Sequence, residues 1–287
     1  MYKFSRASSQ GGYRSNHAIS NDVIAHYAPS VLAESAHESR GERYSFIPTI
    51  NVLDGLRAQG FQPFEVRQTR CRDLAKREFT KHLVRLRHPD AIGSAEEVPE
   101  LVLVNSHDGT SSYQLLAGFF RMVCSNGLIA GNVCNDVRIR HSGNVIDDVI
   151  EGSFRVLENV KQIGARIEQY KSIELSREEA TVFANCALQL RWDEGKAPVS
   201  ADQVLSANRY QDVKPDLWTT FNRVQENLVK GGLGGRGTTG RRMTTRAVGG
   251  VNENVKLNRA LWTLADGLAQ LKSNAVTIEE AKELALI

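Results

Sequence analysis

Residues 100–116 read ELVLVNSHDGTSSYQLL and give the clearest indication of the fold. The run over residues 100–106 is rich in leucine and valine, as expected of a strand. An Asp-Gly pair separates it from a second strand-like run over residues 110–116, and Asp-Gly between two such runs is a strong hairpin signal. The sequence therefore predicts an antiparallel hairpin with residues 107–109 in its turn.

Further strands are predicted upstream and downstream of this hairpin. Residues 61–72 and 79–87 alternate apolar or neutral side chains with basic ones, and residues 136–141 (DVRIRH) do the same. Because successive side chains of a strand point to opposite faces, we expect the arginines on one face and the core residues on the other. Before these strands, apolar residues at helical spacing over 49–59 predict a helix that Gly60 ends.

From about Asn144 the apolar period changes to that of a helix. Ser176 and Glu179 form a capping box for one helix, and Pro215 begins another that Gly231 and Gly232 end. Two more helices are predicted over 254–271 and 277–284. The predicted fold class is α+β: an antiparallel basic sheet with packed helices, followed by a mainly α-helical half. We expect a flexible basic arm over 1–18, an α+β DNA-binding core over 19–143, and a helical region over 144–287 with a flexible Gly/Arg-rich loop over 231–250.

Composition excludes several classes of protein. The chain has 287 residues, of which 41% are hydrophobic, and that is enough for a full core. No apolar run approaches the roughly 18 residues that a membrane span requires. The first residues lack the apolar segment of a signal peptide, so we expect a cytoplasmic protein. The four cysteines form no CxxC pair, and we expect neither a metal site nor a cofactor.

Positive charge is concentrated in two stretches although the whole chain carries only +3. The first, residues 67–88, sums to about +6, from eight basic and two acidic residues. The second, residues 230–246 (KGGLGGRGTTGRRMTTR), has five basic residues, six glycines and no acid. The candidate binding residues are Arg67, Arg70, Arg72, Lys76, Arg77, Lys81, Arg85, Arg87, Arg138, Arg140, Lys230, Arg236, Arg241, Arg242 and Arg246.

Segregated cations of this kind are typical of a surface that meets a polyanion. Arginines on strands and in a glycine-rich loop suit a nucleic-acid backbone, since glycines let main-chain amides approach phosphates. The glycine-rich stretch lacks the GxxxxGK pattern of a nucleotide-binding loop. The alternative interpretations are arginines that pair with local acids and a disordered linker.

His107 and Asp108 allow a second interpretation, because such pairs bind metal in phosphohydrolases. The other candidate ligands, His37, Glu38 and residues 147–148, follow no spacing that brings them together. The simpler interpretation is a turn whose hydrogen bonds come from Ser106 and the hydroxyl residues 110–112.

Three stretches carry a family resemblance: HESRGERYSFIPTINVLDGLRAQGFQPF (37–64), LVNSHDGTSSYQLLAGFFRMVCSNGLIAGN (103–132) and DLWTTFNRVQENLVKGGL (216–233). They closely resemble a family of uncharacterised proteins carried by conjugative plasmids and prophages of enteric bacteria, known as a domain of unknown function. The resemblance spans about residues 29–261. It implies a role on mobile elements, whose DNA passes through single-stranded or broken forms.

The element order over 48–88 and 100–118 is also similar to the core of Erf-type phage single-strand annealing proteins and their eukaryotic recombination-mediator relative. That likeness implies rings that lay a single strand in a basic groove. We therefore expect a non-enzymatic, single-stranded-DNA-binding homo-oligomer that promotes annealing or recombination. No catalytic residue is expected, because annealing needs only charge neutralisation and extended bases. The alternatives are an interaction module that inhibits a host defence or repair protein, and a metal-dependent nuclease.

Overall fold

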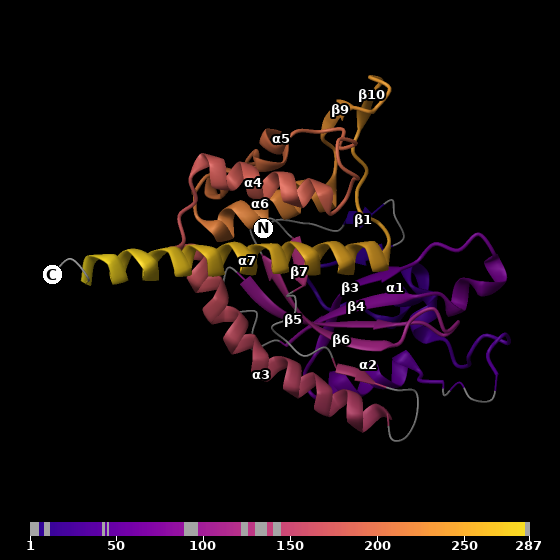
Figure 1. The fold of residues 1–287 in the computed structure, drawn as a ribbon. Helices are drawn as coiled ribbons and strands as arrows, with labels where there is room; N and C mark the ends of the chain where they lie inside the picture. Colours follow the sequence, from indigo (N-terminus) through magenta and orange to yellow (C-terminus); the bar gives the residue numbers. More distant parts are fainter. Residues whose placement is uncertain are drawn as a thin grey trace. The chain divides into compact units, whose positions relative to one another are not determined.

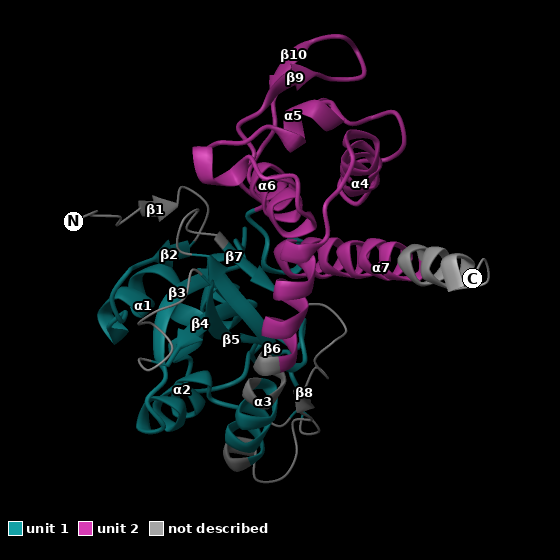
Figure 2. Cartoon of the chain, turned by 90° about the vertical axis from the view of Figure 1, so that its left-hand side faces the viewer, with its two compact units in different colours: residues 1–161, 249–253 teal, residues 162–248, 254–287 magenta. Residues whose placement is uncertain are grey.

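The fold was obtained as a computed structural model that describes residues 6–8, 12–41, 44, 46–88, 97–121, 126–129, 137–139 and 145–284. The chain divides into two compact units (Figure 2). Unit 1 comprises residues 1–161 and 249–253, and unit 2 comprises residues 162–248 and 254–287. The boundary therefore lies inside a helix, about eighteen residues beyond the position expected from sequence, because that helix continues from one unit into the other.

Unit 1 is built on one antiparallel sheet, which confirms the predicted fold class (Figure 1). Its strands follow the order β1-β2-β3-β4-β5-β6-β7, and β8 pairs with the opposite end of β6 from β7. The predicted hairpin over 100–116 is confirmed as β5 and β6, which pair from Glu97 opposite Arg121 to Val104 opposite Gln114. The strands are β1 (Arg6–Ser8), β2 (Gly12–Arg14), β3 (Gln62–Gln68), β4 (His82–Arg87), β5 (Glu97–Asn105), β6 (Tyr113–Arg121), β7 (Asn126–Ile129) and β8 (Val137–Ile139).

Two described parts of the expected flexible arm, residues 6–8 and 12–14, form strands β1 and β2. Residues 12–14 pair with β3, and Arg14 donates through Nε to Glu65 Oε2 at 2.7 Å. A Cβ atom at Gly12 would lie 2.8 Å from the side chain of Arg67, so this position needs glycine for the strands to approach. Strand pairing and an ion pair thus hold residues 12–14 against the sheet.

Short helices accompany the sheet in unit 1: α1 (Asn21–Tyr27), η1 (Pro29–Leu32), α2 (Thr49–Ala58) and η2 (Leu74–Phe79). Helix α2 confirms the predicted helix. It buries Val52, Leu53 and Leu56 at helical spacing, and Gly60 follows with a φ of 92° that favours glycine.

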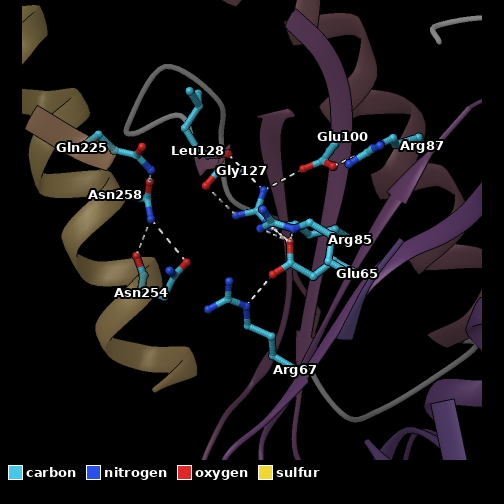
Figure 3. Close-up of polar contacts among 11 residues, drawn as sticks. Glu65, Arg67, Arg85, Arg87, Glu100, Gly127, Leu128, Gln225, Asn254 and Asn258 are labelled. Carbon is cyan, nitrogen blue, oxygen red and sulfur yellow. Dashed lines mark hydrogen bonds and ion pairs between the residues drawn. The ribbon is translucent and has the colours of Figure 1, made fainter. Parts of the chain in front are cut away.

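Unit 2 is helical and confirms the second half of the fold prediction. Its core contains Trp218, Phe221 and Trp262, and Gln225 of α6 donates to Asn258 of α7 at 2.7 Å (Figure 3). The elements are α3 (Val145–Ser172, which begins in unit 1), α4 (Arg177–Gln189), α5 (Ala201–Leu205), η4 (Tyr210–Asp212), α6 (Leu217–Lys230), β9 (Gly234–Arg236), β10 (Arg242–Thr244) and α7 (Val251–Leu284).

The helix ends follow the sequence in most places. Both hydrogen bonds of the capping box at Ser176 are present, and Gly231 ends α6 with a φ of 63°. The prediction of two separate C-terminal helices is wrong, because α7 continues without interruption through Thr277. Residues 251–284 contain no proline and no pair of glycines that would end a first helix. The helix therefore continues past the cap that was expected at Thr277. No helix in the described part of the chain is long and apolar enough to cross a membrane.

Candidate nucleic-acid interface

The connection between β3 and β4 presents the exposed part of the first basic stretch. Arg70, Arg72, Lys76 and Arg77 are all exposed in and around η2. For Arg72, Lys76 and Arg77, no ion pair with a carboxylate occurs among the described residues. This loop, residues 70–77, is called here the η2 loop.

Hydrogen bonds at both ends hold the η2 loop. Asp73 Oδ1 accepts from the amide of Ala75 at 3.0 Å and so caps the short helix. At the other end the carbonyl of Arg77 accepts from Gln68 Nε2 at 2.6 Å and from Thr80 Oγ1 at 3.2 Å. The basic side chains therefore project from a fixed turn.

Arg85 and Arg87 were expected to line an exposed groove, and the structure places them elsewhere. Both are buried at 2% exposure. Arg85 Nη1 donates to Glu100 Oε2 at 2.7 Å and Arg87 Nε donates to Glu100 Oε1 at 2.8 Å (Figure 3). Arg85 Nε also lies 3.6 Å from Glu65 Oε2. The interpretation that these arginines pair with local acids is therefore correct for both residues.

Two glycines make room for the Arg85 guanidinium. A Cβ atom at Gly127 would lie 2.8 Å from Arg85 Cζ, and one at Gly118 would lie 3.2 Å from Arg85 Nη1. The carbonyls of Gly127 and Leu128 accept hydrogen bonds from Arg85 at 3.3 and 3.2 Å. Arg87 instead stacks over the ring of Phe120, with its Cζ 3.8 Å from the ring centroid.

Glu65 is the shared anion of this buried cluster. Burial alone would raise its pKa, but the charges of Arg14, Arg67 and Arg85 outweigh that effect and hold the pKa well below the ordinary 4.5. Arg67 is half-buried and bonded to the Glu65 carboxylate, so it too differs from the expected groove residue. Sequence reasoning missed Glu65 and Glu100. The available signal was an acid inside each of two apolar or basic strands.

Lys81 and Lys230 are also engaged within their own units. Lys81 is buried, and its Nζ donates to Asn252 Oδ1 at 2.7 Å. Burial lowers the pKa of Lys81, partly offset by the charge of Asp108. Lys230 Nζ lies 2.7 Å from Glu226 Oε1. Arg138 lies on β8, opposite Gln114, and its side chain is outside the described residues, as is Arg140 altogether.

The second basic stretch forms a hairpin where an unstructured loop was expected. Strands β9 and β10 pair antiparallel, with Arg242 opposite Arg236, and they project from the helices of unit 2 (Figure 2). Arg236, Arg241, Arg242 and Arg246 are exposed. In the described part of unit 2 none of the four side chains contacts a carboxylate; Arg236 Nη1 donates to the carbonyl of Gly240 at 3.0 Å.

Backbone contacts explain why this glycine-rich segment is ordered. The amide of Arg236 donates to the carbonyl of Pro198 at 2.9 Å, and Gln203 Nε2 donates to the carbonyl of Gly234 at 2.7 Å. A Cβ atom at Gly235 would overlap the Pro198 carbonyl, so only glycine permits this approach. The strands border an open concavity of about 460 Å³ lined by Gly234, Gly235, Arg236, Arg242, Met243 and Thr244.

The paired arginines give the hairpin an unbalanced charge. Like charges directly opposite each other on adjacent strands destabilise a ladder. Arg236 and Arg242 occupy such positions, and residues 231–250 contain no acid to offset them. An anion bound between the two guanidinium groups would remove this repulsion.

The turn after β5 confirms the simpler interpretation of His107 and Asp108. Asp108 Oδ1 accepts from the amide of Thr110 at 3.0 Å and from its hydroxyl at 2.6 Å. The Ser111 amide donates to Ser106 Oγ at 2.9 Å. Within the described ranges, no three His, Cys, Asp or Glu residues lie close enough together to hold a metal ion.

His107 belongs to a buried polar network that sequence reasoning did not foresee. Thr49 Oγ1 lies 2.9 Å from His82 Nε2 and 3.4 Å from His107 Nε2, and Asn105 Nδ2 donates to the same hydroxyl at 3.0 Å. Burial, and then the neighbouring His107, lower the pKa of His82 well below 6.5. These residues come from α2, β4, β5 and the following turn, so no local pattern brings them together.

Fold and surface together define an α+β protein whose described residues present an exposed basic surface on each unit. A family model described as "Domain of unknown function (DUF932)" matches residues 36–262, and the chain belongs to this family. It is similar to the UPF0380 proteins YafZ and YfjQ of Escherichia coli strain K12. Each is 48% identical over 255 residues, which cover 89% of this chain and 93% of the relative.

The resemblance to an uncharacterised family of enteric bacteria is thus confirmed. No solved structure was found to match the chain. The likeness to Erf-type annealing proteins stays a prediction, as does the connection with plasmids and prophages.

Proposed function

We propose that this protein binds single-stranded DNA in the cytoplasm and promotes annealing or recombination of mobile-element DNA, as a homo-oligomer and without a chemical step of its own. The observation that carries the proposal is the β9–β10 hairpin. It holds three exposed arginines, Arg236, Arg241 and Arg242, on an anchored backbone without a neighbouring carboxylate in the described part of the chain.

A phosphodiester backbone supplies the missing negative charge at regular intervals. The η2 loop supports the same ligand, because Arg72, Lys76 and Arg77 are likewise exposed and unpaired among the described residues. Arg85, Arg87, Lys81, Arg67 and Lys230 are not part of the proposed surface, since each already has a partner within the protein.

The test compares two variants with equal loss of charge in unit 2. The first replaces Arg236, Arg241 and Arg242 by glutamine; the control replaces the exposed Arg177, Lys196 and Lys214 by glutamine. Fluorescence anisotropy with a labelled single strand should show about 100-fold weaker binding of the hairpin variant at 0.1 M salt, from three lost phosphate contacts. The control should bind within a few-fold of the wild type.

Annealing is measured with complementary fluorophore and quencher strands, and the hairpin variant should lose the acceleration that the wild type gives. Sedimentation of the wild type tests the homo-oligomer. Equal weakening in both variants would mean a non-specific charge effect. Absence of DNA binding in the wild type would refute the proposal and favour an interaction module, whereas metal-dependent cleavage of the strand would favour a nuclease.

A further inference from the structure

Each of the two basic surfaces exposes one large apolar side chain among its cations. Leu74 in the η2 loop is 78% exposed and follows Arg72 closely, with Lys76 and Arg77 after it. Met243 on β10 is 44% exposed and follows Arg241 and Arg242 directly. The same combination thus occurs on both units within the described residues.

Local structure holds both side chains in the open. The hydrogen bonds of Asp73 to Ala75 and of the Arg77 carbonyl to Gln68 and Thr80 fix the turn that carries Leu74. Met243 lies opposite Gly235 in the ladder. Its Sδ lies 3.3 Å from the place that a Cβ atom would occupy at Gly237. Because both neighbours are glycines without side chains, they shield the Met243 thioether little from solvent.

A single exposed apolar residue is ordinary on a protein surface. The informative feature is its position among cations that form no ion pair within the described residues: Arg72, Lys76 and Arg77 on unit 1, and Arg241 and Arg242 on unit 2. A ligand that fits such a surface carries negative charge for the cations and an apolar face for the exposed side chain. The two must lie within one side-chain length of each other. A single strand does so, because phosphates alternate with unpaired bases. A duplex hides the faces of its bases, and one leucine offers too little apolar surface for stable membrane attachment.

We infer that Leu74 and Met243 contact the unpaired bases of the bound strand, while the arginines beside them contact its phosphates. Leucine and methionine side chains insert between base steps in duplex complexes at the cost of unstacking the bases, and unpaired bases offer their faces without that cost. The inference rests on the proposed function and assigns the ligand class at both surfaces as unpaired nucleotides. It separates two contributions to affinity, since the phosphate contacts depend on salt and the base contacts do not.

The experiment uses the full chain with Leu74→Ser, Met243→Ser and the double variant. Val182→Ser, at a 62% exposed valine on α4, is the matched control. Binding is measured by anisotropy to three probes of equal length: a single strand, the same strand with abasic sites throughout, and a duplex, each from 50 to 200 mM salt. All three positions are exposed, so each variant should remain folded.

Each substitution should weaken single-strand binding about 5-fold, with the salt slope unchanged. Binding of the abasic strand should be the same in the wild type and the variants, and the Val182→Ser control should match the wild type on all three probes. If the variants bind the single strand like the wild type, or weaken abasic and normal strands equally, the base-contact inference is wrong although the proposed function stands.

If the wild type does not bind the single strand, both the proposed function and the base-contact inference are wrong. Phosphatidylserine vesicles provide the remaining arm. Binding of the wild type to vesicles that Leu74→Ser or Met243→Ser abolishes, without an effect on the single strand, would overturn the inference in favour of a lipid surface.

Discussion

Arg72 and Arg85 lie on the same hairpin of the sheet and show how one residue type takes two roles. Arg72 is exposed at the turn, whereas Arg85 is buried between Glu65 and Glu100. A buried guanidinium is stabilised by its partners, and each partner depends on it in return. Removing one member of such a cluster leaves an uncompensated charge.

Arg85→Met should therefore lower the free energy of unfolding by about 3–5 kcal/mol, because Glu100 and Glu65 lose a partner in the interior. Arg72→Met, the matched exposed substitution, should change it by less than about 0.5 kcal/mol. Urea unfolding followed by circular dichroism measures both. Equal stability of the two variants would contradict the buried role of Arg85.

The buried residue His82 leads us to expect that the stability of the protein depends on pH. Its pKa in the folded protein lies well below 6.5, so the unfolded chain takes up a proton first as the pH falls. The contribution of His82 to the free energy of unfolding is fully present above pH 6.5. It decreases below that pH, by up to about 1.4 kcal/mol per pH unit.

The change should be seen in urea unfolding between pH 7 and 5.5, above the range in which carboxylates protonate. His82→Gln should flatten this dependence, and His17→Gln, at an exposed histidine, should leave it as in the wild type. A wild-type curve that is level over this range would contradict the prediction.

At the scale of elements, the β9–β10 hairpin owes its order to a contact outside itself. Three-residue strands rich in glycine have little intrinsic stability. The hydrogen bond from Arg236 to Pro198 and the close approach of Gly235 to the same carbonyl attach it to unit 2.

Gly235→Ala should weaken the attachment of the hairpin without changing its charge, because a methyl group overlaps the Pro198 carbonyl. Gly234→Ala is the control, since a Cβ atom there meets nothing within 4 Å. Trypsin should cut after Arg236, Arg241 or Arg242 about fivefold faster in Gly235→Ala, the effect of one lost hydrogen bond of about 1 kcal/mol on local opening. Equal cleavage of both variants would show that the anchor does not order the hairpin.

At the scale of the whole molecule, each unit carries one exposed basic surface. If both bind the same strand and neutralise about six phosphates together, the salt slope for single strands is roughly −4. That corresponds to about 300-fold weaker binding at 200 mM than at 50 mM salt.

Glutamine at Arg72, Lys76 and Arg77 should bring the slope to about −2, and glutamine at Arg236, Arg241 and Arg242 should do the same. The combined variant should show a slope close to zero. Anisotropy titrations across salt provide the measurement. If only one set of substitutions changes the slope, a single unit binds the strand and the other surface has another role.

Features that depend on neighbours in sequence could be predicted without the structure. The spacing of Val52, Leu53 and Leu56, the capping box of Ser176 with Glu179, and the turn at Asp108 all arise from contacts within about four residues. Alternation likewise placed β4, and the run rich in leucine and valine placed β5. These patterns determined the α+β class and the order of its parts.

The exposure of each arginine was decided only by the tertiary structure. Alternation assigns Arg85 to a face of its strand, but Glu65, Glu100 and the space beside Gly127 come from other strands. The hairpin over 234–244 similarly depends on Pro198, some 36 residues before its first strand. Local sequence determines whether a segment has the apolar periodicity of a helix or of a strand. Burial and ion pairing depend on partners that only folding brings together.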